Sequence, residues 1–210
     1  MSNISGRLGM TSAATIEYLN EVFATIGFDM KAISATNGID IMDSDETITY
    51  ASLYDSTTST NKTGYTLLYN NGESNVHVNR GNGVADTFDV RYSSNGILLH
   101  YYRAAEVTYQ VDMFITKNSD GKIIIGAMQR TTSYLTNTVV YDYPTFDATT
   151  YAYNDKNNTA LLNMIFAGDN DDLNVCEYCF AMLFRSYDNS GTLTLNDEQY
   201  VSNGYWCIKD

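Results

Sequence analysis

The sequence predicts a mainly β domain, an antiparallel β-sandwich or jelly-roll-like domain with a short N-terminal α-helix. Three observations lead to this prediction. Asn-Gly and Asp-Gly pairs recur along the chain, several segments between them alternate apolar and polar residues, and one segment near the N-terminus has helical periodicity. The 18 tyrosines and the single proline fit the same class. Tyr favours pleated strands, and turns without proline rely on Asn, Asp and Gly.

The predicted helix covers residues 11–26. Its apolar residues recur every three or four positions and line one face: Ile16, Leu19, Phe23 and Ile26. Gly27 stands where a left-handed C-terminal cap is expected. We expect residues 1–30 to form an N-terminal arm and helix that pack either on the β-sandwich domain, residues 31–210, or on a neighbouring subunit.

After the helix, six Asn-Gly or Asp-Gly pairs separate the apolar runs. They are Asn37-Gly38, Asn71-Gly72, Asn82-Gly83, Asn95-Gly96, Asp120-Gly121 and Asn203-Gly204. Both residue types tolerate positive φ, which the two central residues of a type I′ hairpin turn require. We therefore expect each pair to form such a turn.

Two segments alternate apolar and polar residues most regularly. Residues 87–92 place an apolar set on one face (Phe88, Val90 and Tyr92) and a polar set on the other (Thr87, Asp89 and Arg91). Residues 106–116 place five apolar side chains inward: Val107, Tyr109, Val111, Met113 and Ile115. The Asp120-Gly121 turn then returns the chain as residues 122–130, which gives the best specified hairpin.

Other segments are less regular. Residues 97–102 and 175–184 are apolar on both faces, which is typical of central strands that are covered on both sides. Residues 160–166 fit a short helix or a strand equally well. Residues 56–64 and 145–159 are polar and are predicted to be loops. Because neither loop is long enough to link domains, we expect one β domain.

The charge balance argues against several partners. The chain carries 25 acidic and 12 basic residues, a formal net charge of −13, and the basic residues are scattered singly. Such a chain repels nucleic-acid phosphates and anionic membranes, so we expect neither partner. The first residues lack the order of a signal peptide, and no window is apolar enough to span a bilayer. We expect a protein made in the cytoplasm with three free cysteines.

The strongest candidate for a metal site is a C-x-x-C pair, Cys176 and Cys179. Cys207 and either His77 or His100 could complete a zinc site. The pair lies in an alternating apolar run that favours a strand, however, and strand residues three apart point to opposite faces. We therefore expect core thiols, with no metal and no cofactor.

Two acidic segments resemble calcium loops. One is the cluster at residues 169–172 (Asp169, Asn170, Asp171 and Asp172). The other, residues 186–197, has Asp188, Ser190, Gly191 and Asp197 at the third, fifth, sixth and twelfth places of such a loop. Its first place is Ser and no predicted helices flank it, so a solvated hairpin is favoured for both segments.

Catalytic motifs are missing from the sequence. There is no nucleophile elbow, no P-loop and no dinucleotide fingerprint. We expect His77 to face solvent and His100 to be a core residue with its hydrogen bonds satisfied. We therefore predict no catalytic residue and no enzyme activity. The alternative, a hydrolase, would use two carboxylates from distant strands, which leave no local spacing.

Aromatic pairs are the remaining feature. Four occur: Tyr101-Tyr102, Tyr141-Asp142-Tyr143, Tyr151-Ala152-Tyr153 and Tyr205-Trp206. They could form a platform for sugar stacking or subunit contacts, because Tyr and Trp bury large areas and keep a polar group. At strand spacing, some residues of each pair must belong to the core.

In its whole-chain character the sequence resembles structural proteins of tailed-bacteriophage virions, such as tail, neck or baseplate components. It is acidic, rich in Asn, Thr and Tyr, and poor in proline, with a helix before a hairpin-rich β domain. The resemblance implies a non-enzymatic homo-oligomer, assembled in the host cytoplasm, that contacts copies of itself and other virion proteins through its helix, loops and sheet edges. The alternative is a glycan- or cell-surface-binding module, such as a phage receptor-binding domain that binds a host surface glycan.

Overall fold

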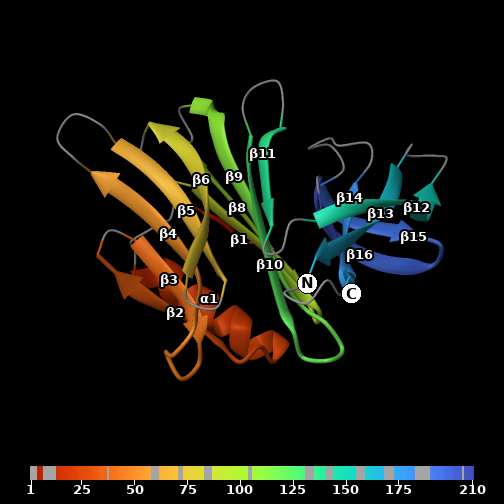
Figure 1. The fold of residues 1–210 in the computed structure, drawn as a ribbon, viewed down its shortest axis with the longest axis horizontal. Coiled ribbons are helices and arrows are strands. Elements are labelled where there is room, and N and C mark those ends of the chain that lie inside the picture. Colours follow the sequence, from red (N-terminus) through yellow and green to blue (C-terminus); the bar gives the residue numbers. More distant parts are fainter. Residues whose placement is uncertain are drawn as a thin grey trace.

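A computed structural model describes residues 4–6, 13–36, 38–57, 62–70, 73–82, 87–103, 106–130, 135–140, 144–154, 159–167, 173–182, 190–204 and 206–210. In this part of the chain the strands form three antiparallel sheets, and one helix lies near the N-terminus (Figure 1). The predicted fold class, mainly β with sandwich-like layers and a short N-terminal helix, is confirmed.

The sheets follow one another along the chain. The N-terminal sheet has the order β2 (Met30–Ala35), β3 (Gly38–Asp43), β4 (Thr49–Thr57), β5 (Lys62–Asn70) and β6 (Glu73–Asn82). The middle sheet has the order β1 (Ile4–Gly6), β7 (Thr87–Ser93), β8 (Gly96–Arg103), β9 (Glu106–Lys117), β10 (Ile123–Arg130) and β11 (Leu135–Val140). The C-terminal sheet has the order β12 (Pro144–Asn154), β13 (Thr159–Ala167), β14 (Leu173–Met182), β17 (Trp206–Lys209), β16 (Glu198–Asn203) and β15 (Ser190–Leu195).

The middle sheet is covered on both faces. On strand β8, Ile97 and Leu99 belong to the core shared with the N-terminal sheet and the helix, whereas Leu98 belongs to the core shared with the C-terminal sheet. All three side chains are at most 1% exposed. The prediction that this segment is a central strand covered on each side is therefore confirmed.

The helix α1 (Ala13–Ile26) packs on the core of its own chain. Leu19, Val22 and Phe23 are buried there, and Ile16 and Ile26 pack partly against the same cluster. The helix ends in a Schellman motif. Gly27 has a φ of 70°, its N–H donates to the Ala24 carbonyl, and the Phe28 N–H donates to the Phe23 carbonyl at 2.9 Å.

The helix also covers the free edge of strand β2. The Asn20 side chain donates to the Ala32 carbonyl at 2.9 Å and accepts from the Ala32 N–H at 2.7 Å. One side-chain amide thus supplies both bonds that a neighbouring strand would make at that residue. Such a cap prevents another strand from pairing there.

The C-terminal sheet curls until its two edge strands, β12 and β15, lie close to each other. The curl encloses a small core of its own: Leu161, Phe180, Met182, Leu195, Tyr200 and Cys207. The opposite face of strands β14, β16 and β17 packs on the middle sheet. These strands are therefore apolar on both faces, which agrees with the prediction for residues 175–184.

The hairpin turns differ in detail from the prediction. Ser93 pairs with Gly96, so the turn residues are Ser94 and Asn95, and Gly96 is the first residue of strand β8. A Cβ on Gly96 would lie 2.5 Å from the Ile115 carbonyl oxygen. This glycine is therefore required by the close approach of strand β9 and not by turn geometry. Gly38 likewise is the first residue of a strand, since it pairs with Ala35.

A tight turn also forms where no glycine marks it. Asn196 and Asp197 join β15 to β16 with φ values of 50° and 64°, which is the left-handed pair of a type I′ turn. Asn and Asp tolerate this region because their short polar side chains make local hydrogen bonds. The described part of residues 186–197 is thus a strand and a hairpin turn, and it is not a calcium loop.

Two predicted loops contain strands. Residues 145–159 were expected to be a loop, but β12 extends to Asn154, so this prediction is wrong. Strands β4 and β5 likewise occupy both ends of the predicted loop 56–64. Thr and Tyr fill these polar segments, and they favour strands even without apolar alternation. Residues 160–166 are a strand, and the hairpin over residues 106–130 is confirmed.

We expect the substitution Gly96→Ala to lower the free energy of unfolding by about 1–3 kcal/mol, because its methyl group would overlap the backbone of strand β9. The measurement is chemical denaturation. The control is Ser94→Ala in the same turn, an exposed position where a change within about 0.5 kcal/mol is expected. Equal effects of both substitutions would contradict the argument from close packing.

Candidate functional site

A row of ionisable side chains crosses the middle sheet on the face that meets the C-terminal sheet. In the strand register Asp89 of β7 lies opposite His100 of β8, and His100 lies opposite Asp112 of β9. Facing residues on neighbouring antiparallel strands are in contact distance, so the three groups form one cluster. Together with Arg91, Ser202 and Asn203, we call this cluster the polar junction.

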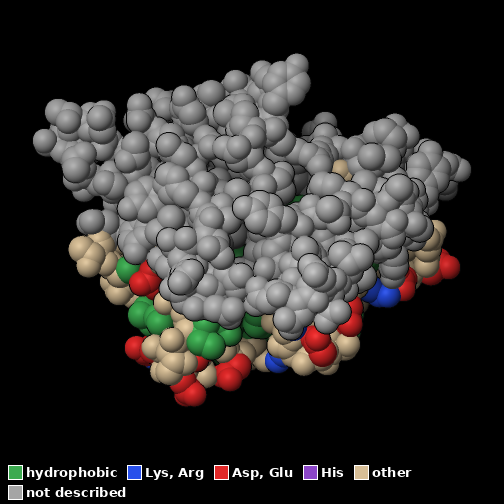
Figure 2. Space-filling model, in the orientation of Figure 1, with side chains coloured by type: hydrophobic (Ala, Val, Ile, Leu, Met, Phe, Trp, Pro, Cys, Tyr) green, Lys and Arg blue, Asp and Glu red, His purple; other side chains and the backbone are tan. Residues whose placement is uncertain are grey.

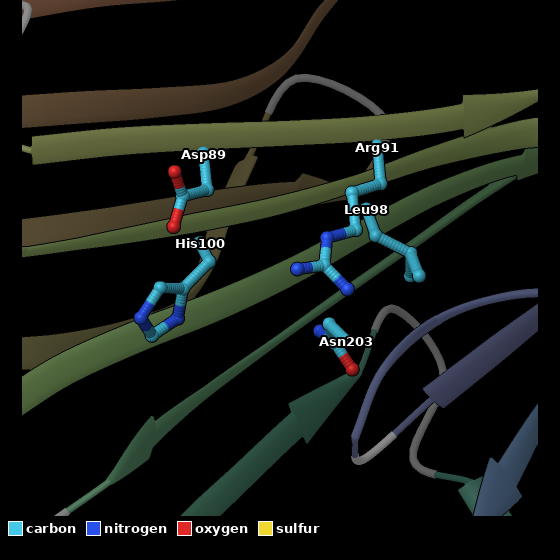
Figure 3. Close-up of a pocket in the computed structure, with 5 residues that line it drawn as sticks. All are labelled: Asp89, Arg91, Leu98, His100 and Asn203. Carbon is cyan, nitrogen blue, oxygen red and sulfur yellow. The ribbon is translucent and has the colours of Figure 1, made fainter. Parts of the chain in front are cut away.

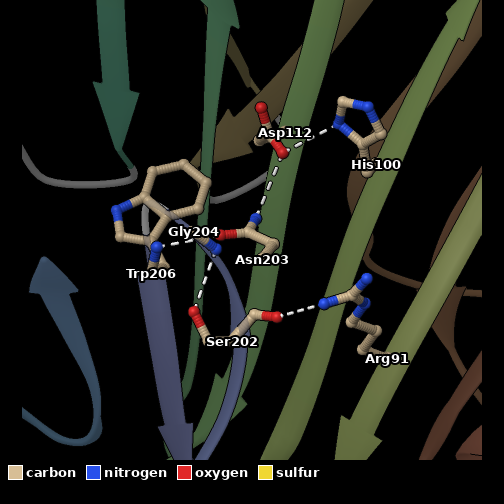
Figure 4. A network of polar contacts seen from close by, with 7 residues as sticks. All are labelled: Arg91, His100, Asp112, Ser202, Asn203, Gly204 and Trp206. Atoms are coloured by element: carbon tan, nitrogen blue, oxygen red, sulfur yellow. Dashed lines mark hydrogen bonds and ion pairs between the residues drawn. The ribbon is translucent and has the colours of Figure 1, made fainter. Parts of the chain in front are cut away.

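The centre of the polar junction is a buried hydrogen-bonded chain (Figure 4). His100 Nδ1 donates to Asp112 Oδ1 at 2.9 Å, and Asn203 Nδ2 donates to the same oxygen at 3.1 Å. Asn203 Oδ1 in turn accepts from the Trp206 N–H at 2.9 Å. His100, Asp112 and Asn203 are 6%, 0% and 4% exposed. One asparagine side chain thus links a buried carboxylate of the middle sheet to the turn between β16 and β17.

Arg91 holds the same turn from the other side. Its guanidinium donates to the Ser202 carbonyl at 2.5 Å. The Ser202 hydroxyl accepts from the Gly204 N–H at 2.9 Å and donates to Met182 Sδ at 3.1 Å. Charged donors make stronger hydrogen bonds than neutral ones, so this contact fixes the turn on the middle sheet.

A small cavity lies beside this chain (Figure 3). Asp89, Arg91, Leu98, His100 and Asn203 line it, and it holds about 240 Å³ of space, part of which opens to solvent. Asp89 Oδ1 is buried there with no hydrogen-bond partner in the described part of the chain. Burial raises the pKa of the Asp89 carboxyl, while the charges of His100 and Arg91 act in the opposite direction. Ligand pockets usually hold about 300–1,000 Å³, so this cavity is below the size of a substrate site.

The polar junction therefore serves best as a connection between sheets. A His–Asp pair can also act as a general base, but here the shared Asp112 oxygen also bonds an asparagine that holds the neighbouring sheet. Buried polar groups that satisfy one another fix a single arrangement of the elements that carry them. Two further bonds support the same interface, from Ser93 Oγ and Asn95 Nδ2 to the Lys209 carbonyl.

The prediction for the C-x-x-C pair is wrong in its geometry. Cys176 and Cys179 both face the middle sheet and belong to one apolar cluster. Strand β14 is bulged, because four residues between Val175 and Phe180 lie opposite one residue of β13. The bulge breaks the two-residue period on which the prediction rested. Both thiols are fully buried core residues, as expected, and burial raises the pKa of Cys179 well above its ordinary value.

The structure also describes two other residues that the sequence singled out, His100 and Trp206. The prediction that His100 is a satisfied core residue is confirmed. Trp206 is buried and packs edge-on against Phe114, so it offers no exposed platform. The following lie outside the described residues or have side chains outside them: His77, the cluster 169–172, Asp188, Tyr205 and the other aromatic pairs.

Sequence reasoning missed the polar junction itself. Asp89 and Arg91 were placed on the polar face of an alternating strand, a pattern that usually means solvent. The sequence does contain one indication that Asp89 and Arg91 are covered. Their strand precedes the strand at residues 97–102, which is apolar on both faces and contains His100. Asn203 was assigned to a turn, and its role depends on a contact with Asp112, 91 residues away.

Comparison with known proteins gives no match: no family model fits the chain, and no curated protein or solved structure is significantly similar to it. Within the described residues, no group of three or more His, Cys, Asp or Glu side chains is arranged to hold a metal ion. The helix that the structure describes is too short to cross a membrane.

We expect Asn203→Ala to destabilise the protein by about 2–3 kcal/mol, because it leaves the Trp206 N–H unpaired and removes one donor to a buried carboxylate. The measurement is urea denaturation. The matched control is Gln199→Ala on the same strand, whose exposed side chain bonds Thr194 and no other described residue, and a loss below about 0.5 kcal/mol is expected there. Similar losses for both variants would show that Asn203 does not join the sheets.

The raised pKa of Asp89 predicts a pH dependence with a definite sign. A raised pKa in the folded protein means that stability falls as pH rises through that pKa. Asp89→Asn removes this loss, so the variant should gain stability relative to the wild type between acidic and neutral pH. Denaturation over a pH series measures the difference.

Asp43→Asn serves as a control of opposite sign. Hydrogen bonds from the Ile48 N–H and from Thr47 lower the pKa of Asp43. The stability that this carboxylate contributes is present at neutral pH and is lost as pH falls through the lowered pKa, so the variant should lose most at neutral pH. The same pH trend in both variants would refute the assignment for Asp89.

Proposed function

We propose that this chain is a non-enzymatic structural subunit of a tailed-phage virion, a tail, neck or baseplate component that forms a symmetric assembly. The observation that carries the proposal is the polar junction. Its ionisable groups are used to fasten the C-terminal sheet to the middle sheet. Two sheets fastened in this way, with the N-terminal sheet packed on the middle sheet through an apolar core, suit a protein that transmits load between neighbours.

The way in which the sheet edges are covered supports the same proposal and indicates which surfaces remain for contacts between copies. The Asn20 side chain caps the edge of β2, and the edge strands β12 and β15 lie against each other. Strand β6 contacts the middle sheet at β9, β10 and β11. These edges are therefore protected from uncontrolled pairing with other chains. We expect copies to meet through the exposed helix face, hairpin turns and sheet surfaces, and not by strand addition at these edges.

The surface charge fits a subunit that stays soluble until it assembles. In Figure 2 the described side chains on the visible face include many Asp and Glu and few Lys or Arg. This agrees with the formal net charge of −13 for the whole chain. A net negative charge keeps free subunits apart, and salt weakens that repulsion.

The proposal predicts that purified protein forms a symmetric oligomer whose population rises with protein and salt concentration, because salt screens the repulsion between acidic subunits. Native mass spectrometry and electron microscopy measure the subunit number and the symmetry. Asn203→Ala provides a comparison, since a loosened polar junction should weaken the assembly at temperatures where the subunit is still folded. A wild-type protein that remains monomeric under all these conditions and binds no virion component would rule the proposal out.

A further inference from the structure

A second hollow, unrelated to the polar junction, lies where four separate elements meet. It is lined by the end of the helix, the β7–β8 turn, the β9–β10 turn and strand β14: Ile26, Gly27, Phe28, Ser94, Asn95, Lys117, Asn118, Ser119 and Tyr178. We call it the basal groove. It holds about 530 Å³ of space, which includes its open side.

The walls of the basal groove are held in place before any ligand binds. The Glu177 carboxylate accepts from the Ser119 N–H at 2.7 Å and from the Ser119 hydroxyl at 2.9 Å. The Glu177 N–H donates to Asn118 Oδ1 at 3.1 Å. These bonds join the β9–β10 turn to strand β14, and a rigid wall lowers the entropy lost on binding.

The bulge in strand β14 is what presents Tyr178 to the groove. Cys176 and Cys179 both turn inward, so the two residues between them, Glu177 and Tyr178, lie on the outside. Bulges commonly re-aim side chains next to binding sites. Opposite this wall, Gly27 leaves open space, since a Cβ built on it would meet no atom within 4 Å.

Several polar groups on the lining are left without internal partners. The Ser94 hydroxyl, the Lys117 ammonium and the Tyr178 hydroxyl form no side-chain hydrogen bond or ion pair with any residue that the structure describes. Asn95 uses its Nδ2 on the Lys209 carbonyl, and its Oδ1 makes no such bond. The groove therefore offers two hydroxyls, one ammonium donor, one amide acceptor and a tyrosine side chain.

This set of groups selects the chemistry of the ligand. Nucleotides and other strongly anionic molecules are disfavoured, because the groove has one ammonium in a chain of net charge −13. Cations are disfavoured because none of the described residues that line the groove carries a carboxylate, and nearby Glu177 is occupied by Ser119. A purely apolar ligand would leave the polar groups unsatisfied. A neutral polyhydroxyl molecule matches mixed donors and acceptors beside a tyrosine ring.

We propose that the basal groove is a saccharide-binding site that takes a neutral mono- or disaccharide unit, with Tyr178 packing on the sugar and Ser94, Asn95 and Lys117 bonding its hydroxyls. The described lining of the site comes from one chain, so the site needs no second subunit. It can therefore exist whether or not the chain forms a virion structure, and its test uses the dissolved full-length protein.

The test is an NMR titration of the isotope-labelled full chain with single neutral sugars (glucose, galactose, mannose, N-acetylglucosamine and lactose), with N-acetylneuraminic acid as an anionic comparison. Binding of a neutral sugar should shift the backbone amide signals of Gly27, Ser94 and Lys117. Weak affinity, with a dissociation constant of about 1 mM, corresponds to about −4 kcal/mol and suits a shallow groove.

Two variants and one control locate the site. Ser94→Trp fills the groove from an exposed turn position and should abolish the shifts, and Lys117→Met should weaken binding about tenfold. Lys122→Met is the matched control, because Lys122 lies in the same β9–β10 loop but does not line the groove, and its affinity should equal that of the wild type.

The outcomes are decisive for the sugar site alone. No shift with any neutral sugar, binding that survives Ser94→Trp in a folded protein, or preferential binding of N-acetylneuraminic acid would each overturn the proposal. Fold is checked by the amide spectrum of each variant without sugar. Failure here leaves the assembly proposal standing, since that rests on oligomer formation and not on sugar binding.

Discussion

The structure depends on one constraint, which is that the middle sheet has no solvent-exposed face at its centre. Water has little access to the polar groups there, so an unpaired group is costly. His100 and Asp112 satisfy each other, and Asn203 extends their pairing to the next layer. The apolar contacts around Leu98 and Phe114 bring the sheets together, while the polar bonds fix their relative position.

Strand β14 shows how one irregularity can serve two purposes. The bulge between Val175 and Phe180 turns both thiols of the C-x-x-C pair into the core and both intervening side chains outward. A regular strand would put Tyr178 and Cys179 on opposite faces and would send Cys176 to the same side as Tyr178. The extra residues therefore allow a fully apolar inner face and a polar outer wall within one short segment.

Much of the fold could be predicted from local patterns, and the site could not. Periodicity predicts the helix, through its i, i+3, i+4 spacing. It also predicts the 106–130 hairpin and the doubly covered strand at Ile97–Leu99. Strand β12 was missed because its Thr and Tyr residues do not alternate with apolar ones. The polar junction was missed because Asn203 and Asp112 meet only after two sheets pack, and no local rule encodes such a contact.

The cap formed by Asn20 has a consequence for biosynthesis. Because the helix precedes strand β2 along the chain, it leaves the ribosome before the edge that it covers. The side chain that closes the Ala32 position is thus already present when β2 and β3 first pair. Unpaired strand edges make partly folded chains prone to aggregation. The order of elements along the chain therefore means that Asn20 is synthesised before the edge of strand β2 that it caps.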